Sequence, residues 1–325
     1  MATIAIIGAG MAGLACARKL AKAGMAVTLF DKGRGVGGRM ATRRVETPQG
    51  VLRFDHGAQY FTVRDPGFRA ALADLPDAVA PWLENGGDPS EERFVGVPSM
   101  NGLPKAMAKG LDVRLSLRIT DLRRNPEGWA LTAEDGAGFG PFDGVAVAVP
   151  AEQTGAIVAP HSPAFAAQAQ AARAAPCWAG LFAVDTQNPP PFAAQRLKDH
   201  PVLAWIACDS AKPGRNPSPQ TWVLHARPDW SAAHLEDAPE AVSGLLQEAF
   251  VEMVQPNGPI VYAQAHRWRY AQVAQPAATP FAWDEGLRLG LCGDWRIGPR
   301  IEAAWRSGDA LADAILADAI LESGI

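Results

Sequence analysis

Long apolar runs are missing from this 325-residue sequence, since no segment reaches the ~18 consecutive apolar residues that a membrane-spanning helix requires. An excess of basic residues is also missing: 34 acidic side chains outnumber 30 basic ones, and the formal net charge is -4. This balance argues against a general nucleic-acid surface. No positive charge precedes the N-terminal apolar run, so it does not resemble a signal sequence. We therefore expect a cytoplasmic protein with neither nucleic-acid nor membrane partners.

Cysteine is scarce and is not arranged for metal binding. The four cysteines are scattered without CxxC spacing, so the sequence indicates neither a disulfide framework nor a structural zinc site, and we predict no metal. A Ser-His-Asp, Cys-His or paired-carboxylate set is also missing. No residue is therefore assigned with certainty as a catalytic group.

A glycine-rich turn stands close to the N-terminus. The apolar run at residues 3–7 predicts a buried strand, residues 14–22 favour a helix, and a second strand is expected at residues 26–30. Between strand and helix lies a G-x-G-x-x-G pattern. A lone match to this pattern is weak evidence, but its position in a strand-turn-helix unit predicts a dinucleotide site.

Each fingerprint residue has an expected task. Gly8 permits the tight turn, Gly10 lets the backbone approach a diphosphate, and Gly13 lets the helix pack close to the strand. Ala12 lies in the same loop, where the helix N-terminus faces the phosphates. Asp31, at the end of the second strand, is placed to accept hydrogen bonds from an adenosine ribose.

A second glycine cluster, Lys32-Gly-Arg-Gly-Val-Gly-Gly-Arg39, follows Asp31. A nicotinamide dinucleotide site does not need this cluster. A flavin site of the two-dinucleotide type uses such a Gly-Gly doublet and a following Arg to contact the diphosphate and ribityl chain of FAD. We therefore expect Lys32, Gly38 and Arg39 to bind FAD.

The end of the chain predicts a third flavin element. A strand ending in Gly293-Asp294 precedes a helix expected at residues 301–321. Asp294 is expected near the ribityl chain or diphosphate. The helix N-terminus, beginning at Ile301, is expected to face the pyrimidine ring of the flavin.

The remaining sequence indicates two interleaved domains. Strands are expected at residues 129–133, 144–150, 178–184, 202–208, 222–226 and 260–270, a helix at 238–254, and a loop tip at 86–90. We predict an α/β fold in which a Rossmann-type, two-dinucleotide-binding FAD domain is interleaved with an antiparallel-sheet α+β substrate domain. The FAD domain comprises residues 1–62, 95–150 and 282–325, and the substrate domain comprises residues 63–94 and 151–281.

Several of these motifs together resemble the bacterial renalases, a branch of the flavin amine oxidase-like proteins. The resemblance covers most of the chain: the fingerprint, the Gly-Gly-Arg cluster, the Gly57-Ala58-Gln59-Tyr60 stretch, His225, the Trp268-Arg269 pair and the terminal Gly-Asp. Animal members tend to carry His where this chain has Tyr270. The fold implied is that of the amine oxidase and p-hydroxybenzoate hydroxylase-like flavoproteins.

The resemblance implies an oxidase of dihydronicotinamide isomers. Hydride passes from 2-dihydro-NAD(P), with 6-dihydro-NAD(P) as a second candidate, to flavin N5. The products are NAD(P)+ and, after reoxidation by molecular oxygen, hydrogen peroxide. The substrate-binding residues implied are His225, Trp268, Tyr60, Arg269 and Tyr270. His56, Gly57, Ala58 and Gln59 join the cofactor-binding set, and we expect FAD to be bound non-covalently although His56 is of a type that can attach flavin.

Other interpretations stay open at this stage. The same scaffold serves amine oxidases and carotenoid-type desaturases, and a non-catalytic flavin-binding redox protein would carry identical cofactor motifs. His225 shares a strand face with Val223, opposite Trp222 and Leu224, and is either a hydrogen-bonded structural histidine or a substrate contact. Trp268 and Tyr270 share a face with His266, where they either pack a core or flank a planar ring.

Overall fold

The computed structural model of this chain describes residues 2–48, 50–82, 92–277 and 279–323. Two compact units are each assembled from separate segments. Unit 1 comprises Met1–Gly38, Pro104–Ala174 and Val273–Ile325, and unit 2 comprises Arg39–Leu103 and Ala175–Gln272. The predicted loop tip at 86–90 lies outside the described residues.

Unit 1 is built on a six-stranded sheet, ordered β18-β19-β12-β1-β2-β8, in which every pair except β18-β19 is parallel. The central strands are almost wholly buried, as expected of apolar runs in a sheet covered on both faces. The strands are β1 (Thr3–Ile7), β2 (Ala26–Phe30), β8 (Asp112–Arg114), β12 (Gly144–Val147), β18 (Ala282–Asp284) and β19 (Leu289–Leu291). The predicted Rossmann-type α/β arrangement is confirmed.

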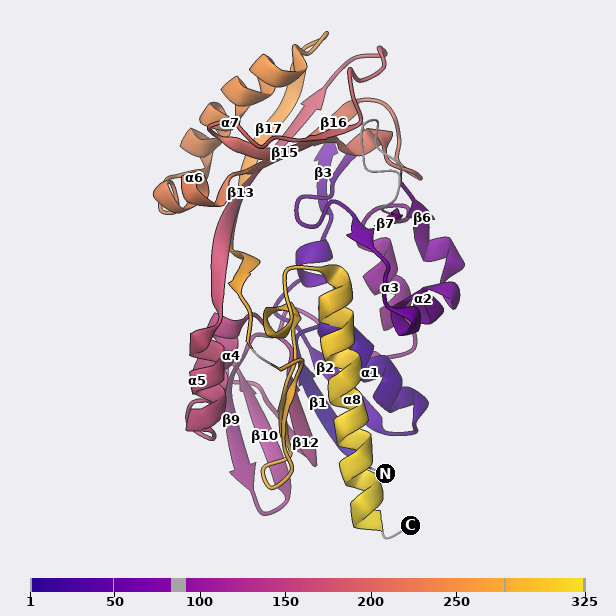
Figure 1. Cartoon of the computed structure of the whole chain (residues 1–325), viewed down its shortest axis with the longest axis vertical. Helices are drawn as coiled ribbons and strands as arrows, with labels where there is room; N and C mark the ends of the chain where they lie inside the picture. The colour runs from indigo at the N-terminus through magenta and orange to yellow at the C-terminus, as the bar shows by residue number, and fades with distance from the viewer. Residues whose placement is uncertain (1, 49, 83–91, 278, 324–325) are drawn as a thin grey trace. The chain divides into compact units, whose positions relative to one another are not determined.

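Two helices of unit 1 lie side by side, α1 (Met11–Lys22) and α8 (Ile301–Ser323), as Figure 1 shows. A Cβ on Gly308 would lie 1.9 Å from the carbonyl oxygen of Ala12, so glycine permits the close approach of the two backbones. Farther along, the amino group of Lys19 pairs with Asp309 and Asp313. Both helices therefore run in the same direction from the glycine-rich end of the sheet.

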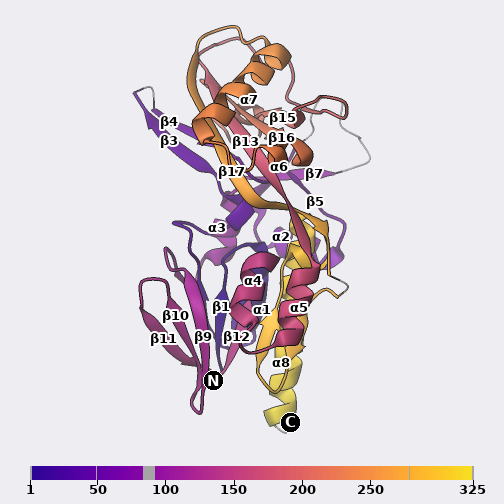
Figure 2. The same ribbon diagram turned by 90° about the vertical axis from the view of Figure 1, so that its left-hand side faces the viewer.

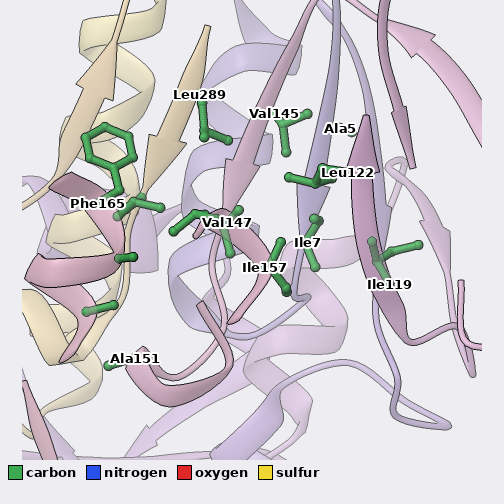
Figure 3. Packing of buried hydrophobic residues seen from close by; sticks show 14 of the residues in the cluster. Ala5, Ile7, Ile119, Leu122, Val145, Val147, Ala151, Ile157, Phe165 and Leu289 are labelled. Carbon is green, nitrogen blue, oxygen red and sulfur yellow. The ribbon is translucent and has the colours of Figure 1, made fainter. Parts of the chain in front are cut away.

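A second layer completes the core of unit 1. It contains the antiparallel sheet β11-β10-β9 and two helices. Their bounds are β9 (Ile119–Asn125), β10 (Gly128–Ala133), β11 (Gly138–Phe142), α4 (Ala151–Val158) and α5 (Pro163–Ala171). Figure 3 shows Val145 and Val147 of the parallel sheet in one cluster with Leu122, Ile157 and Phe165 from this layer. Burial of these apolar side chains stabilises the fold that carries the glycine loop.

Unit 2 is built on a five-stranded sheet, ordered β14-β15-β16-β13-β17. Its strands are β13 (Arg173–Val184), β14 (Ala194–Arg196), β15 (Leu203–Cys208), β16 (Gln220–Ala226) and β17 (Ile260–Gln275). The pairs β14-β15, β15-β16 and β16-β13 are antiparallel, as predicted for the substrate domain.

The two faces of this sheet have different covers. On one face, Trp222 and Leu224 pack against Leu246 and Phe250 of α7 (Pro239–Val254). On the other, Val223 packs with Leu52 and Phe54 of the hairpin β3 (Arg43–Thr47) and β4 (Gly50–Phe54). Figure 2 shows the α7 and β3-β4 ribbons on opposite sides of the sheet. The predicted alternation of β16 is confirmed, with His225 on the face shared with Val223.

The rest of unit 2 consists of short elements. A three-stranded sheet has the order β5-β7-β6. The bounds are β5 (Phe61–Thr62), β6 (Val79–Pro81), β7 (Arg93–Gly96), α2 (Pro66–Ala73), α6 (Pro228–Ala233), η2 (Pro76–Ala78) and η3 (Asp209–Ala211). The chain passes from one unit to the other within α3 (Gly102–Ala108) and within η1 (Gly38–Met40). The short helix η4 (Asp294–Arg296) belongs to unit 1.

The compact units divide the chain at different places from the predicted domains. Residues 39–62 and 95–103, predicted in the FAD domain, belong to unit 2, and residues 151–174 and 273–281, predicted in the substrate domain, belong to unit 1. The physical reason is that α4 and α5 pack into the core of the parallel sheet. Which domain binds cofactor and which binds substrate stays a prediction.

Some local features differ from expectation. The helix predicted at 238–254 is present as α7, but its apolar residue Leu245 is 41% exposed, because the helix buries Val242, Leu246 and Phe250. All four cysteines are buried and free. Among the helices that the structure describes, none combines the length and apolar character needed to cross a membrane.

Candidate active site

The glycine loop of unit 1 has the geometry of a dinucleotide cradle. Gly8 has a φ of +109°, which disfavours any residue with a Cβ, and a Cβ on Gly13 would lie 1.9 Å from the Gly8 carbonyl oxygen. Gly10 differs, because a Cβ there would meet no protein atom within 4 Å. Gly8 and Gly13 are therefore required by the protein backbone, whereas Gly10 borders open space.

This open space adjoins the N-terminus of α1, where Ala12 lies in the first turn. Gly10 is the N-cap of the helix and supplies no side-chain cap to the first backbone N–H groups. An uncapped helix N-terminus attracts anions, so the loop residues fit the diphosphate of a dinucleotide. The glycines at positions 8, 10 and 13 have no side chain that could obstruct such a group.

Asp31 holds the loop from the end of β2. Its Oδ2 accepts a hydrogen bond from the backbone N–H of Ala9 at 2.7 Å, and its Oδ1 accepts one from Gly33 at 2.7 Å. Each carboxylate oxygen retains a further acceptor site. The predicted contact with a ribose stays a prediction, and the structure adds a role in shaping the loop.

The second glycine cluster lies against the fingerprint. Gly37 donates its N–H to the Ala9 carbonyl at 2.8 Å, and Gly38, with φ of +54°, would place a Cβ 3.7 Å from the Cα of Gly10. Lys32, beside Asp31, donates to Oε1 of Gln153 at 3.0 Å. The predicted cofactor residues Gly10, Lys32 and Gly38 are therefore gathered in unit 1.

The C-terminal element belongs to the same unit. Gly293 has φ of +153° and donates its N–H to the hydroxyl of Ser307 on α8 at 2.9 Å. Asp294 is buried and begins η4, and its carbonyl accepts from the N–H groups of residues 297 and 298. Ile301 begins α8, as predicted.

Arg39 and the segment after it belong to unit 2. A Cβ on Gly57 would lie 2.0 Å from the Arg39 carbonyl, which also accepts a hydrogen bond from Ala58 at 2.8 Å. The Arg39 guanidinium donates to the carbonyl of Ala271 at 3.1 Å. Arg39, Gly57 and Ala58 are therefore packed together, and their contact with the cofactor stays a prediction.

In unit 2, two predicted substrate residues converge on one backbone oxygen. The His56 carbonyl accepts a hydrogen bond from Trp268 Nε1 at 3.0 Å and lies 3.2 Å from His225 Nε2. A carbonyl can only accept, so His225 carries its proton on Nε2, and Nδ1 of the neutral ring is an acceptor. Among the described residues, Nδ1 of His225 has no hydrogen-bond partner.

Three aromatic rings pack beside this carbonyl. The His56 ring centroid lies 4.6 Å from that of His266 and 5.0 Å from that of Trp268, and the latter two are 4.7 Å apart. Burial lowers the pKa of His56 to about 3, with further lowering by His266 and Arg43. Burial also lowers the pKa of His225 to about 4. The pKa of His266 is lowered by burial and then by Arg43. All three histidines are neutral at physiological pH.

A buried ionic cluster anchors the segment that contains His56. Lys212 pairs with Asp209 at 2.5 Å and Arg215 pairs with Asp55 at 2.5 Å, and all four side chains are at most 4% exposed. Burial opposes ionisation of Asp55, but the charges of Lys212 and Arg215 outweigh it and hold the pKa of Asp55 below its usual range. The two negative charges of Asp55 and Asp209 are thus balanced by the two positive charges of Lys212 and Arg215.

Gln59 connects this cluster to the site. Its Oε1 accepts a hydrogen bond from Lys212 at 3.2 Å, and its amide donates to the carbonyls of Asp55 and Gly57. The side chain thereby fixes the backbone on both sides of His56. The structure gives the predicted cofactor residue Gln59 a positioning role, while its contact with cofactor stays a prediction.

The other predicted substrate residues occupy different surroundings. Tyr60 packs against Trp205, with ring centroids 5.6 Å apart, and accepts a hydrogen bond from Arg196 at 2.8 Å. Arg269 instead forms a two-bond ion pair with Glu236, with a shorter distance of 2.7 Å, at the exposed surface. Tyr270 is partly buried on the neighbouring position of β17. The structure brings His225 and Trp268 together, whereas Arg269 is paired with Glu236.

Sequence reasoning missed the ionic cluster and the partners of Tyr60. The spacing of Asp209 and Lys212 allows a pair at i and i+3, but no local signal indicates that the pair is buried. Arg196 and Trp205 become neighbours through strand pairing, which the sequence pattern alone does not specify. Among the described residues, no group of three or more His, Cys, Asp or Glu side chains could hold a metal.

Comparisons with known proteins agree with this arrangement. A family model described as an NAD(P)-binding Rossmann-like domain matches residues 6–75, and one described as a flavin containing amine oxidoreductase matches residues 82–316. A solved protein from Exiguobacterium sp. 255-15, assigned as a protoporphyrinogen oxidase, has a TM-score of 0.70 and 12% identity, over 97% of this chain and 98% of its own. The structure of wild-type putrescine oxidase bound to putrescine has a TM-score of 0.70 and 13% identity, over 97% of this chain and 99% of its own.

The second family model covers well over half of the chain, and the chain therefore belongs to the flavin-containing amine oxidoreductase family. Its cofactor is FAD, and it is an FAD-dependent oxidoreductase. The likeness to the solved structures, at 12% and 13% identity, concerns the fold.

Proposed function

We propose that this protein is an FAD-dependent oxidase of dihydronicotinamide isomers, 2-dihydro-NAD(P) and also 6-dihydro-NAD(P). The observation that carries the proposal is the neutral aromatic face formed by His225, Trp268 and the two histidines beside them. The motif resemblance to bacterial renalases supports the same substrate class.

Oxidation of a dihydropyridine makes modest demands on the protein. The substrate is already a strong hydride donor, so the site has to bind and orient it rather than remove a proton. Bound FAD supplies a two-electron acceptor that molecular oxygen reoxidises with formation of hydrogen peroxide. A general base with a pKa near the operating pH is not needed, and the lowered pKa values of His56 and His225 agree with this requirement.

The described contacts suggest how the nicotinamide ring is held. Trp268 provides an apolar wall, and its orientation is fixed by its hydrogen bond to the His56 carbonyl. His225, held by Nε2, offers Nδ1 as an acceptor for the N–H of the substrate carboxamide. This arrangement favours one orientation of the ring without any proton transfer.

Charge also distinguishes this proposal from amine oxidation. An alkylamine is a cation at neutral pH, whereas a dinucleotide carries negative diphosphate charges. The charge of Lys212 is compensated by its buried partner Asp209. Arg43, which lowers the pKa values of His56 and His266, instead donates to the neutral amide oxygen of Gln264 at 3.4 Å. The positive charge of Arg43 beside the histidines favours an anionic substrate over a cationic one.

An anaerobic reduction experiment tests the proposal. The purified flavoprotein is mixed separately with 2-dihydro-NAD, 6-dihydro-NAD, ordinary NADH, and a set of amines that includes putrescine, while the flavin absorption band is followed. Rapid bleaching by a dihydro isomer, with slow or no bleaching by NADH and amines, is the expected result.

Two other outcomes would reject the proposal. Bleaching by amines alone would identify an amine oxidase. No bleaching by any donor, with photochemical reduction still possible, would favour a non-catalytic flavin-binding redox protein.

A further inference from the structure

Three side chains on neighbouring strands of unit 2 lie in one row. Arg196 of β14 is the register partner of Trp205 of β15, and Trp205 is the register partner of His225 of β16. Directly paired residues in a sheet point to the same face. With an inter-strand spacing of about 4.8 Å, the backbones of Arg196 and His225 are roughly 10 Å apart.

The segment from His56 to Tyr60 lies along this row. At one end the His56 carbonyl contacts His225, and at the other the Tyr60 hydroxyl accepts a hydrogen bond from Arg196 at 2.8 Å. The Tyr60 ring packs on Trp205 between them. One backbone segment therefore connects the nicotinamide end of the face to the arginine.

Arg196 has the features of an anion-binding side chain. Its guanidinium carbon lies 5.6 Å from the Trp205 ring centroid, and the side chain is exposed. Among the described residues it has no carboxylate partner, unlike Arg269 with Glu236 or Arg215 with Asp55. Four of its five N–H donors remain after the bond to Tyr60.

A second arginine helps to fix Tyr60. The guanidinium carbon of Arg93 lies 4.6 Å from the Tyr60 ring centroid. Two arginines therefore contact Tyr60, Arg196 at its hydroxyl and Arg93 over its ring. With the ring fixed in this way, the Tyr60 hydroxyl holds the Arg196 guanidinium, whose planar fork of donors is suited to a phosphate group.

We propose that Arg196, oriented by Tyr60 and Trp205, binds the diphosphate of the dinucleotide substrate. This inference rests on the proposed function and names the part of the substrate that the site recognises besides the ring. In a nicotinamide nucleotide, a ribose separates the ring from the first phosphate, and the spacing between His225 and Arg196 accommodates such a separation. The diphosphate is also the substrate's permanent negative charge.

The role predicts an effect on binding rather than on hydride transfer. Arg196 contacts a part of the substrate that does not react, so Arg196→Gln is expected to raise the dissociation constant of 2-dihydro-NAD about tenfold. The limiting rate of flavin reduction at saturating substrate should stay within about twofold of the wild-type rate. Higher salt should weaken binding to the wild type more than to the variant.

The experiment compares two donors that differ in phosphate content. Anaerobic reduction is measured over a concentration series of 2-dihydro-NAD and of 2-dihydronicotinamide riboside, which has no phosphate. Arg196→Gln should raise the dissociation constant of the dinucleotide but not that of the riboside. Arg196→Lys should raise the dissociation constant of the dinucleotide by a smaller factor. Arg53→Gln, which removes an exposed arginine of β4 whose neighbours Leu52 and Phe54 are buried, is the matched control and should change neither constant.

The outcomes separate this inference from the proposed function. Suppose that the dihydro isomers reduce the wild-type flavin, but Arg196→Gln leaves the dissociation constant of the dinucleotide unchanged or raises that of the riboside equally. Diphosphate binding by Arg196 is then wrong, while the proposed function stands. If neither donor reduces the wild type, the proposed function is wrong. Tyr60→Phe, which removes the hydroxyl that orients Arg196, should reproduce part of the Arg196→Gln effect, and failure to do so would reject the orienting role of Tyr60.

Discussion

Trp268 and His56 are separated by 212 positions in the sequence, yet the indole Nε1 of Trp268 donates a 3.0 Å hydrogen bond to the His56 carbonyl. The same carbonyl lies 3.2 Å from Nε2 of His225. One backbone oxygen thereby sets the orientation of two side chains that were expected to contact substrate. Its own position depends on Gln59 and the buried ions beneath it. Substrate orientation in the proposed site is thus a property of the whole face.

The first prediction concerns the role of His225. Replacing it by Ala removes one hydrogen bond to the substrate, which is worth ~0.5–1.5 kcal/mol, so flavin reduction should slow about two- to twelve-fold. Loss of a general base commonly costs ~10²–10⁴-fold. The anaerobic reduction rate at saturating 2-dihydro-NAD distinguishes these scales, after FAD content has been checked. A thousand-fold loss would contradict a role in orientation alone.

Trp268 offers a matched comparison. Trp268→Phe keeps an aromatic wall but loses the hydrogen bond to His56, whereas Trp268→Ala loses both. The rate of reduction should therefore fall more for the alanine variant. Equal, unchanged rates and affinities in both variants would show that the substrate binds elsewhere.

A second prediction concerns stability against acid. The pKa of His56 is lowered to about 3 and that of His225 to about 4, whereas an unfolded histidine has a pKa of ~6.5. Between these values the unfolded state binds more protons, so stability is complete above pH ~6.5 and falls as the pH is lowered. Each histidine contributes a slope of roughly 1.4 kcal/mol per pH unit in this window.

Chemical denaturation at pH values from 7.5 to 4.5 measures this slope. The double variant His56→Gln and His225→Gln should show a shallower dependence than the wild type over the same range. His234, which is partly exposed and pairs with Asp237 at 2.7 Å, provides the control, since His234→Gln should leave the wild-type slope nearly intact. Equal slopes for the double variant and the wild type would contradict the assignment of the two neutral histidines.

A third prediction is that FAD is bound non-covalently. The proposal rests on the glycine cradle and Asp31, which can hold a dinucleotide through backbone contacts, and on the burial of His56 among other rings. Acid precipitation of the purified protein should leave the yellow colour in solution. A yellow pellet would indicate a covalent link, and His56→Gln would then show whether this residue forms it.

The local patterns of the sequence predicted much of unit 1. The strands and the first helix follow from apolar runs and glycines that are adjacent in the chain, and these features require no knowledge of distant partners. The same is true of the alternation that places His225 beside Val223. The contacts within unit 2 were harder to predict from the sequence, because those of His56, Tyr60 and Lys212 join positions far apart in the chain.

Individual residues show why the rest could not be predicted. Arg269 follows Trp268 directly, and the motif placed both in the substrate site. In a strand, however, adjacent side chains point to opposite faces, and Arg269 pairs with Glu236 while Trp268 bonds to His56. Burial of the Lys212 ion pair depends on the packing of the whole unit and carries no signature in local composition.

A fourth prediction separates the two kinds of glycine in the fingerprint. A Cβ at position 10 would meet no protein atom within 4 Å. Gly10→Val should therefore leave the fold intact while abolishing FAD binding. Gly13→Ala would place a Cβ 1.9 Å from the Gly8 carbonyl and should destabilise the protein by about 1–3 kcal/mol or more. FAD content by absorbance and unfolding of the apoproteins distinguish the two effects.

A glycine outside the loop provides the control for this pair. Gly244 lies in α7 and a Cβ there would meet no atom within 4 Å, so Gly244→Ala should retain FAD and raise stability slightly. A Gly10→Val protein that retains full FAD would reject the role of the fingerprint loop. A stable Gly13→Ala protein would show that the loop can relax.

The last prediction concerns the buried ions that support His56. Lys212→Met leaves Asp209 without its 2.5 Å partner in a position that is 1% exposed. Removal of one member of a buried ion pair typically costs about 3–5 kcal/mol, because the remaining charge is neither solvated nor paired. By contrast, Lys19→Met breaks pairs with Asp309 and Asp313 that are partly exposed, and should cost about 1 kcal/mol or less. Urea denaturation of both variants gives the comparison. Where Lys212→Met does not fold, the double variant with Asp209→Asn restores charge balance and should recover part of the stability. A double variant no more stable than the single one, or a Lys212→Met protein as stable as Lys19→Met, would show that charge compensation does not hold this segment in place.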